Sequence, residues 1–394
     1  IYILNECETH LTPNNYNIKK LSDNKLIFRV NEVNNFEKYI TAKHNACVNY
    51  YSTTYFDWTY YYQKYAPWIK NKTYLDCLQH YFNYGKQSKL DTFEVGSSLI
   101  NKYNIKLIAH YITAQNPNIK SIPWKPLFGD HVIKYPPNNY KSNDVNTLKK
   151  HIELAKKCGI FGFCLQYNPQ NEVINLFFNH SQLNIPCCLY MDTCDTKTLA
   201  SVSIYFKSNR YIKVSGKPVI LTNHKFTTTP EEIFIIHVAT SQIDNICDNQ
   251  PLTTLDPFYR MSKNPKYIVS KNTHHLIDYY WLCHSTNNEP QKTSIYFRQI
   301  FTGFDNTLNV REKIKSICPF VTPNAVYSAL KSQMEGILER PNPQGIDNLI
   351  FINSWNDWEN QMIMETPEIL DAIHNVVIQY NNPQSYNKVN DILL

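Results

Sequence analysis

Glycine is scarce in this sequence, with 9 residues among 394. Neither glycine-rich phosphate signature, G-x-G-x-x-G or G-x-x-x-x-G-K, occurs, so nothing supports a nucleotide site built on a glycine loop. No two cysteines have the C-x-x-C spacing, which leaves a zinc site with little support. The sequence also lacks a secretory signal pattern and any apolar run near the length of a bilayer span, which argues against a transmembrane helix.

Charge and cysteine content narrow the class further. The formal net charge is +6, but the lysines are dispersed, and a nucleic-acid binder is expected to cluster them. Cysteine occurs 11 times, and Cys158, Cys164, Cys187 and Cys188 lie in or beside apolar segments, as buried free thiols do. Free thiols favour a reducing compartment such as the cytoplasm. Abundant Asn, Lys and Ile resemble the composition of proteins from large DNA viruses and AT-rich microbes.

The first 95 residues differ from the rest of the chain in their pattern of polar and aromatic residues. Residues 1–50 are polar and irregular, whereas aromatic residues recur at helical spacing over 51–90, with Pro67 and Gly85 as breaks. This spacing predicts two or three short aromatic helices. We expect them to form a cap or spacer, the alternative being a surface for protein partners.

From about residue 105, apolar runs alternate with amphipathic stretches. The runs predict strands at 106–112, 160–167, 185–192, 217–223, 294–301 and 349–355. Helices are predicted over 145–159, with Asp144 as N-cap and Gly159 as stop, from Pro323 to about Leu338, and from Thr366. Short apolar strands alternating with helices are typical of a parallel sheet, and about eight such units favour a closed (β/α)8 barrel. A doubly wound sheet is the alternative.

The stretch LIFINSWNDWE (349–359) is the most informative part of the chain. An apolar strand ends in two tryptophans, Trp355 and Trp358, which bracket Asn356 and Asp357. Aromatic faces beside an acid suit a sugar ring, whose C–H faces are apolar and whose hydroxyls need polar partners. Simple packing of the tryptophans is the alternative interpretation.

Three acids follow predicted strands, where a parallel barrel places its functional side chains. Asp192 ends one strand, Asp305 follows a second beside Asn306, and Asp357 follows a third. Glycosidic chemistry needs a proton donor and a nucleophile or base, usually two carboxyl groups. Each Asp alone is also a typical helix N-cap. Two further candidates for contact with sugar hydroxyls are His131, in a loop after the first strand, and Tyr167, at the end of the second.

Five islands of sequence resemble the WbsX family, which is labelled as glycosyltransferases of polysaccharide gene clusters. They are KPLFGDH (125–131), ELAKKCGIFGFCLQY (153–167), GKPVIL (216–221), FTGFDNT (301–307) and FINSWNDWENQMIMETP (351–367). The family is similar to the family 99 glycoside hydrolases, which are endo-α-mannosidase-like barrels. The resemblance implies a (β/α)8 barrel over 105–385 after an N-terminal region of 1–95.

The departures from the family pattern bear on activity. The resemblance implies two catalytic glutamates three residues apart. Here the first is Asp357, which is one methylene shorter, and the second is Asn360, which has no acid group. A family glutamate after the third strand corresponds to Cys194, so Asp192 or the neighbouring Glu359 is left as the second acid.

Two functions therefore follow from the sequence. The first is a carbohydrate-active enzyme that transfers or hydrolyses a glycosyl group, with catalytic residues Asp357, Asp192 and Glu359 and no metal or other cofactor. Its substrate-binding residues are Trp355, Asn356, Trp358, His131, Tyr167, Asp305 and Asn306. The second is a degenerate barrel that binds glycans without chemistry. In both, the partner is a glycan or an activated sugar, and the oligomeric state stays open.

Overall fold

The computed structural model describes the chain in several stretches. They are residues 56–115, 119–121, 133–138, 140–170, 172–192, 194–222, 232–237, 295–308, 318 and 321–382, together with the backbone of 19–22, 25–28, 267–269, 274–276 and 315–317. The predicted contact residue His131 lies outside them.

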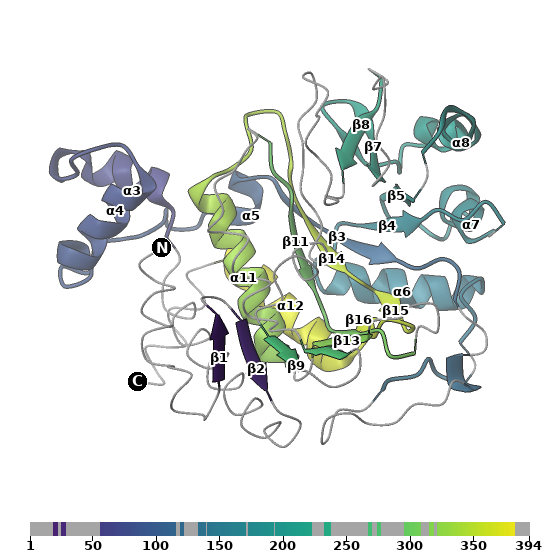
Figure 1. Ribbon diagram of the computed structural model, residues 1–394. Coiled ribbons are helices and arrows are strands. Elements are labelled where there is room, and N and C mark those ends of the chain that lie inside the picture. Colours follow the sequence, from purple (N-terminus) through teal and green to yellow (C-terminus); the bar gives the residue numbers. More distant parts are fainter. Residues whose placement is uncertain are drawn as a thin grey trace.

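Seven parallel strands form the centre of the molecule (Figure 1). Their order in the sheet is β11 (Arg298–Phe301), β14 (Asn348–Asn353), β3 (Ile105–Tyr111), β4 (Gly162–Gln166), β5 (Cys187–Met191), β7 (Lys217–Thr222) and β8 (Phe234–His237). A short antiparallel strand, β6 (Lys213–Val214), pairs with β7. Each of the six strands predicted from apolar runs is confirmed, with ends that differ by a few residues.

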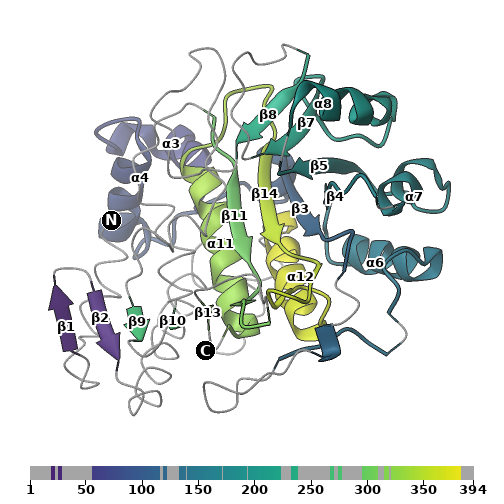
Figure 2. The same cartoon turned by 45° about the vertical axis from the view of Figure 1, so that its right-hand side comes forward.

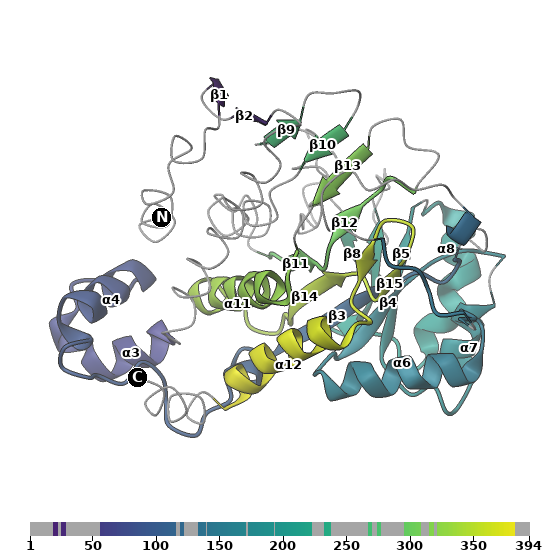
Figure 3. The ribbon, with the colours of Figure 1, turned by 90° about the horizontal axis from the view of Figure 1, so that it is seen from below.

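The helices cover one face of this sheet, as Figures 2 and 3 show. They are α6 (Val145–Lys157), α7 (Val173–Asn179), α8 (Thr196–Val202), the turn η6 (Ser203–Lys207), α11 (Pro323–Glu339) and α12 (Pro367–Asn381). The predicted ends of the helices are confirmed. The Asp144 carboxylate accepts from the Thr147 backbone N–H at 2.8 Å at the start of α6. Gly159 then ends the helical segment with a φ of +81°, where a Cβ would lie 2.6 Å from Val377.

The strand order bears on the two predicted architectures. Strands β3, β4, β5, β7 and β8 follow one another in chain order, and the last strand, β14, pairs with the first, β3. A doubly wound sheet reverses direction at a switch point and carries helices on both faces, whereas this sheet advances in one direction with its helices on one face. Among the described strands the row is open between β8 and β11, yet the rings of Phe234 and Phe297 approach to 5.8 Å across that gap. The described strands thus form one parallel row in which β14 and β11 precede β3.

Further short strands lie on the side of the sheet opposite α6 and α12 (Figure 3). Strands β1 (Lys19–Ser22) and β2 (Lys25–Phe28) form a hairpin, and β2 pairs in parallel with β9 (Tyr267–Val269). A second group joins β10 (His274–Leu276), β13 (Lys315–Cys318) and β12 (Phe304–Asp305). The hairpin is a correction to the expectation that residues 1–50 are irregular. Its strands are four residues each, too short for a clear alternation of polar and apolar positions.

The aromatic region forms a helical lobe beside the sheet, on the left in Figure 1. It contains α3 (Trp58–Tyr65), the turn η3 (Ala66–Trp68), α4 (Tyr74–His80) and the π-helical turn η4 (Tyr81–Gly85). Its buried side chains form a separate hydrophobic cluster: Phe56, Tyr61, Tyr65, Ile69 and Cys77. The predicted short aromatic helices are confirmed.

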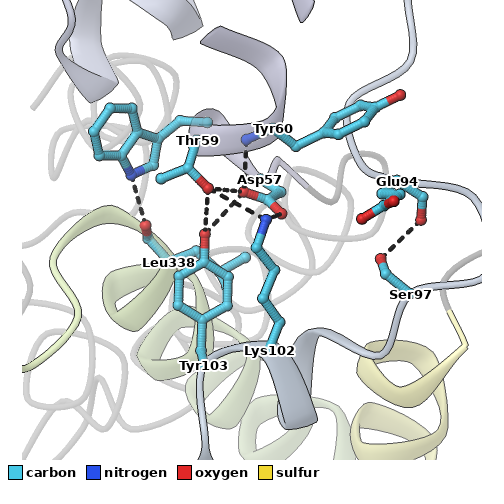
Figure 4. Close-up of polar contacts among 9 residues, drawn as sticks. Asp57, Thr59, Tyr60, Glu94, Ser97, Lys102, Tyr103 and Leu338 are labelled. Atoms are coloured by element: carbon cyan, nitrogen blue, oxygen red, sulfur yellow. Dashed lines mark hydrogen bonds and ion pairs between the residues drawn. The ribbon is translucent and has the colours of Figure 1, made fainter. Parts of the chain in front are cut away.

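A buried acid fastens this lobe to the segment that leads into β3 (Figure 4). Asp57 is 0% exposed and accepts hydrogen bonds from Lys102 Nζ, in the short helix α5 (Leu99–Lys102), at 2.5 Å and from the Tyr103 hydroxyl at 2.8 Å. Burial alone would raise the pKa of Asp57, but these bonds and those from Thr59 and Tyr60 hold its pKa below the usual value. Trp58 Nε1 also donates to the Leu338 carbonyl of α11 at 2.8 Å.

The described cysteines, among them Cys158, Cys164, Cys187 and Cys188, are buried and form no disulfide. In the same stretches, no helix combines the length and the apolar character that a bilayer crossing needs.

Candidate functional site

The site begins where β14 ends. The Asn353–Ser354 peptide bond is cis, and the chain then folds into a tight hairpin of β15 (Asn356–Asp357) and β16 (Met362–Ile363). The Ser354 hydroxyl fixes this hairpin, because it donates to the Met362 carbonyl at 2.8 Å and accepts from the Asp357 N–H at 3.0 Å. The sequence motif therefore places Asp357 at the carboxyl end of a central strand, as predicted.

Asp357 is a nearly buried carboxyl group, with 7% of its surface exposed. Burial raises its pKa to about 6, and the nearby charge of Glu359 contributes to the increase, whereas hydrogen bonds from Asn360 oppose it. A carboxyl group with this pKa is mostly ionised at pH 7 and still holds a proton in a useful fraction of molecules. That is the range in which an acid can act in proton transfer.

Asn360, which the sequence comparison aligned with the second glutamate, contacts Asp357 directly. Its Nδ2 donates to both carboxylate oxygens, at 3.2 and 3.0 Å, and its backbone N–H donates to Oδ1 at 3.1 Å. An amide in this place holds the carboxylate without adding a charge. Glu359, the adjacent acid, is partly exposed.

Both tryptophans of the motif are packed. Trp355 is 0% exposed, and its ring lies 5.4 Å from Phe163 and 5.7 Å from His151, on the side of the sheet covered by α6. Trp358 is 5% exposed and packs edge-on against Tyr140 at 5.9 Å. Neither ring has an exposed face. The tryptophans therefore pack in the protein interior in this structure, as the alternative interpretation expected.

Asn356 clamps two loops together. It is fully buried, its Oδ1 accepts from the Ile112 N–H at 2.9 Å, and its Nδ2 donates to the Ile112 carbonyl at 3.1 Å and to the Tyr140 hydroxyl at 3.0 Å. Gln115 Nε2 adds a bond to the Asn356 carbonyl at 2.9 Å. The side chain predicted to bind substrate thus ties the segment after β3 to the hairpin after β14.

Asp305 and Asn306 lie beside the same hairpin, because β11 is the neighbour of β14. The Asp305 N–H donates to the Asn360 carbonyl at 2.9 Å, and its carboxylate accepts from the Thr307 N–H at 2.8 Å. Both side chains are buried, with 0% and 7% exposure. Gly303 permits this approach, because a Cβ there would lie 2.8 Å from the Gln361 carbonyl oxygen.

The remaining predicted residues lie farther from Asp357. Asp192 is exposed and follows β5, three strands from β14, which is roughly 14 Å along the sheet at about 4.8 Å per strand. Tyr167 is partly exposed after β4, and its hydroxyl lies 3.1 Å from Ser201 Oγ. Asp195 is an N-cap, whose carboxylate accepts from the Thr198 N–H at 2.7 Å. The structure therefore brings Asp305, Asn306, Asn356 and Glu359 to Asp357, but not Asp192 or Tyr167.

A buried polar network behind this hairpin was not predicted from the sequence. His151 of α6 lies with Nε2 3.0 Å from a Glu365 carboxylate oxygen and Nδ1 2.9 Å from the Tyr111 hydroxyl. Its ring stacks on Tyr140 at 5.8 Å. In the sequence, the only sign of this network was one histidine on the apolar face of a helix, which does not identify its partners.

In the described stretches, no group of three or more His, Cys, Asp or Glu side chains is arranged to hold a metal ion.

Comparisons with known proteins agree with the resemblance read from the motifs. A family profile described as "Glycosyltransferase WbsX" matches residues 227–372, which include Asp305, Asp357 and Asn360. The match covers the last two of the five islands, at 301–307 and 351–367, and confirms the WbsX resemblance there. No curated protein matches the chain.

Two solved structures are similar to the chain at low sequence identity. The GH99 endo-α-mannosidase from Bacteroides thetaiotaomicron is 13% identical, with a TM-score of 0.41, over 71% of this chain and 98% of that one. A structure described as a glycoside hydrolase-like protein is 12% identical, with a TM-score of 0.46, over 74% of this chain and 96% of that one.

Proposed function

We propose that the chain is a carbohydrate-active protein that acts on a glycan or glycosyl donor through the carboxyl group of Asp357. The observation that carries this proposal is a nearly buried acid, with a pKa raised to about 6, at the carboxyl end of a central parallel strand. The WbsX match supports it because the matched residues include Asp357. The strand order and the Phe234–Phe297 contact support a closed (β/α)8 barrel as its scaffold.

The proposed chemistry assigns Asp357 the role of proton donor to the leaving oxygen of a glycosidic bond. A second carboxyl group then stabilises the sugar cation or activates the acceptor. Glu359 and Asp305 are better placed for this role than Asp192, because they belong to the hairpin around Asp357 or contact it. Hydrolysis and transfer differ in whether the acceptor is water or a sugar hydroxyl, so the same residues serve either reaction.

The test is turnover by the wild-type protein, Asp357→Asn and Asp371→Asn. Asp371 lies on the exposed side of α12, so its variant is a matched acid-to-amide control. The proteins are incubated with fluorescently labelled oligosaccharides and with nucleotide sugars plus acceptors, and the products are separated by chromatography. Loss of the proton donor is expected to lower the rate at least about a hundredfold, whereas the control keeps the wild-type rate. Equal rates for wild type and Asp357→Asn would refute the assignment.

The second candidate is a barrel that binds glycans without chemistry, and the contact of Asn360 with both oxygens of Asp357 favours it. Here glycans bind to wild type and to Asp357→Asn equally, and no product forms. The variant Asn360→Glu places a second acid beside Asp357. It therefore tests whether the site has lost an activity that a second acid can restore. Turnover that appears only in Asn360→Glu supports a degenerate site.

A further inference from the structure

The register of the sheet defines a second set of side chains that the sequence motifs did not identify. On the helix-covered face, Tyr111 contacts His151 of α6, and Arg298 donates to the Gly336 carbonyl of α11 at 2.6 Å. Side chains alternate between faces along a strand, and paired residues of neighbouring strands point the same way. The residues adjacent to Tyr111 and Arg298 therefore point to the opposite, inner face.

Polar and aromatic side chains gather on this inner face near the carboxyl ends of five strands. They are His110, Gln166, Tyr190, Gln299 and Asn353. All five are partly exposed, whereas most residues before and after them in the strands are buried. The His110 ring lies 6.1 Å from Tyr190 and 5.7 Å from Phe351, so contacts between strands β3, β5 and β14 join these positions into one surface.

Three of these side chains, those of Gln166, Gln299 and Asn353, differ from the paired residues in their hydrogen bonding within the described stretches. Gln299 Oε1 is shielded from solvent and accepts no hydrogen bond from the residues described. The side chains of Gln166 and Asn353 likewise bond to no other residue in the described stretches. A shielded amide without a partner is costly, typically by about 1–3 kcal/mol, unless a ligand or water supplies the missing bond. On the outer face, Tyr111 and Arg298 each have a protein partner, although the buried Trp355 Nε1 has none among the described residues.

The inner face is also uncharged toward the carboxyl ends of the seven described strands. Lys106 and Lys217 occupy inward positions only at the amino-terminal ends of β3 and β7, and Lys106 is paired with Asp347 at 2.5 Å. Burial lowers the pKa of His110 to about 4, so its ring is neutral at pH 7. Amides, a phenol and a neutral imidazole suit a hydroxyl-rich, uncharged ring. A diphosphate instead needs cations or a glycine loop.

We propose that His110, Gln166, Tyr190, Gln299 and Asn353 form the surface that binds the sugar ring, and that this surface takes uncharged glycans and not nucleotide-diphosphate sugars. The inference rests on the proposed function and specifies its ligand class. Asp357 lies in the β15–β16 hairpin, which begins just after Asn353 at the carboxyl end of β14.

The test measures binding by the full-length chain to an array of neutral oligosaccharides and, by calorimetry, to UDP, GDP and their sugar conjugates. The variants are Gln166→Ala and Gln299→Ala. Gln182→Ala is the matched control, because Gln182 is exposed in the loop that enters β5 from the opposite end of the sheet. The best neutral glycan from the array is expected to bind each inner-face variant roughly three- to tenfold more weakly, and the control with wild-type affinity. UDP and GDP are expected not to bind.

The outcomes separate this inference from the proposed function. Neutral glycans that bind wild type and both inner-face variants equally overturn the assignment of the surface and leave the proposed function intact. Nucleotide sugars that bind and lose affinity in the variants overturn the ligand class. Absence of any glycan or nucleotide-sugar binding overturns both. If a variant melts at a lower temperature, hydrogen exchange of the wild-type protein replaces the affinity comparison. The glycan is expected to protect the backbone amides of β4 and β11, and a lack of protection would refute the proposed binding surface.

Discussion

Two successive residues of β11 illustrate how the two faces of the sheet differ. Arg298 is buried on the outer face, where it donates to the Gly336 carbonyl and lies 5.2 Å from the Tyr296 ring. Gln299 turns to the inner face, where its shielded Oε1 accepts no hydrogen bond from the described residues. On the outer face, Arg298 is a polar group of the scaffold with a protein partner. The inner face thus carries a shielded amide oxygen without a partner among the described residues.

The largest expected effect comes from breaking the outer-face network at His151. In His151→Leu, the Glu365 carboxylate loses its partner at 3.0 Å and the Tyr111 hydroxyl loses its partner at 2.9 Å. Removing one member of a buried pair typically costs 3–5 kcal/mol, and because Glu365 keeps some exposure we expect about 3 kcal/mol. Urea unfolding at pH 7 measures the loss. Adding Glu365→Gln to this variant should recover part of the stability, because it removes the unpaired charge. A loss under about 1 kcal/mol would mean that the network is not scaffold.

The next effect concerns Asp357, which belongs to the site and not to the scaffold. Its folded-state pKa is about 6, above the value of 3.8 expected of an unperturbed Asp, so the folded state binds the proton more tightly than the unfolded state. The folded protein therefore loses stability as pH rises from about 4 to about 6, and no further change arises from this group at higher pH.

Asp357→Asn removes this titration. We expect the stability of the variant relative to wild type to increase by about 2–3 kcal/mol between pH 4 and pH 7, since each pKa unit corresponds to about 1.4 kcal/mol. Urea unfolding of both proteins at several pH values measures the difference. If the difference in stability between the wild type and Asp357→Asn does not change with pH, Asp357 is not a buried acid with a raised pKa.

The sequence predicted the scaffold better than the site, for physical reasons. Strands such as β3 and β14 are apolar runs, and α6 has both an N-cap at Asp144 and a glycine stop, so local chemistry alone defines them. The two-residue strands β12 and β15 are too short for a pattern of alternating residues, and they are strands only because β13 and β16 pair with them.

The orientation of Trp355 shows why the site was harder. A side chain just beyond a strand can turn to either face, and the turn after Asn353 directs Trp355 to the outer core. The inner-face residues did leave a signal. His110, Gln166 and Gln299 are polar interruptions of apolar strands, but only the register between strands reveals that they share a face.

The smallest expected effect tests the contrast within β11 directly. Arg298→Met removes a buried cation whose pKa is lowered to about 10 by burial, and it leaves the Gly336 carbonyl without its donor at 2.6 Å. The carbonyl still accepts from the Arg340 N–H at 3.0 Å, so we expect a loss of about 1.5–3 kcal/mol from the charge-assisted hydrogen bond alone. Gln299→Met has similar volume and removes a shielded amide that has no partner, so its stability should change by less than about 0.5 kcal/mol or increase. Thermal and urea unfolding of the two variants gives the comparison. Equal losses of stability would show that Gln299 also stabilises the fold. Gln299 would then not be an unpaired group that is available to a ligand.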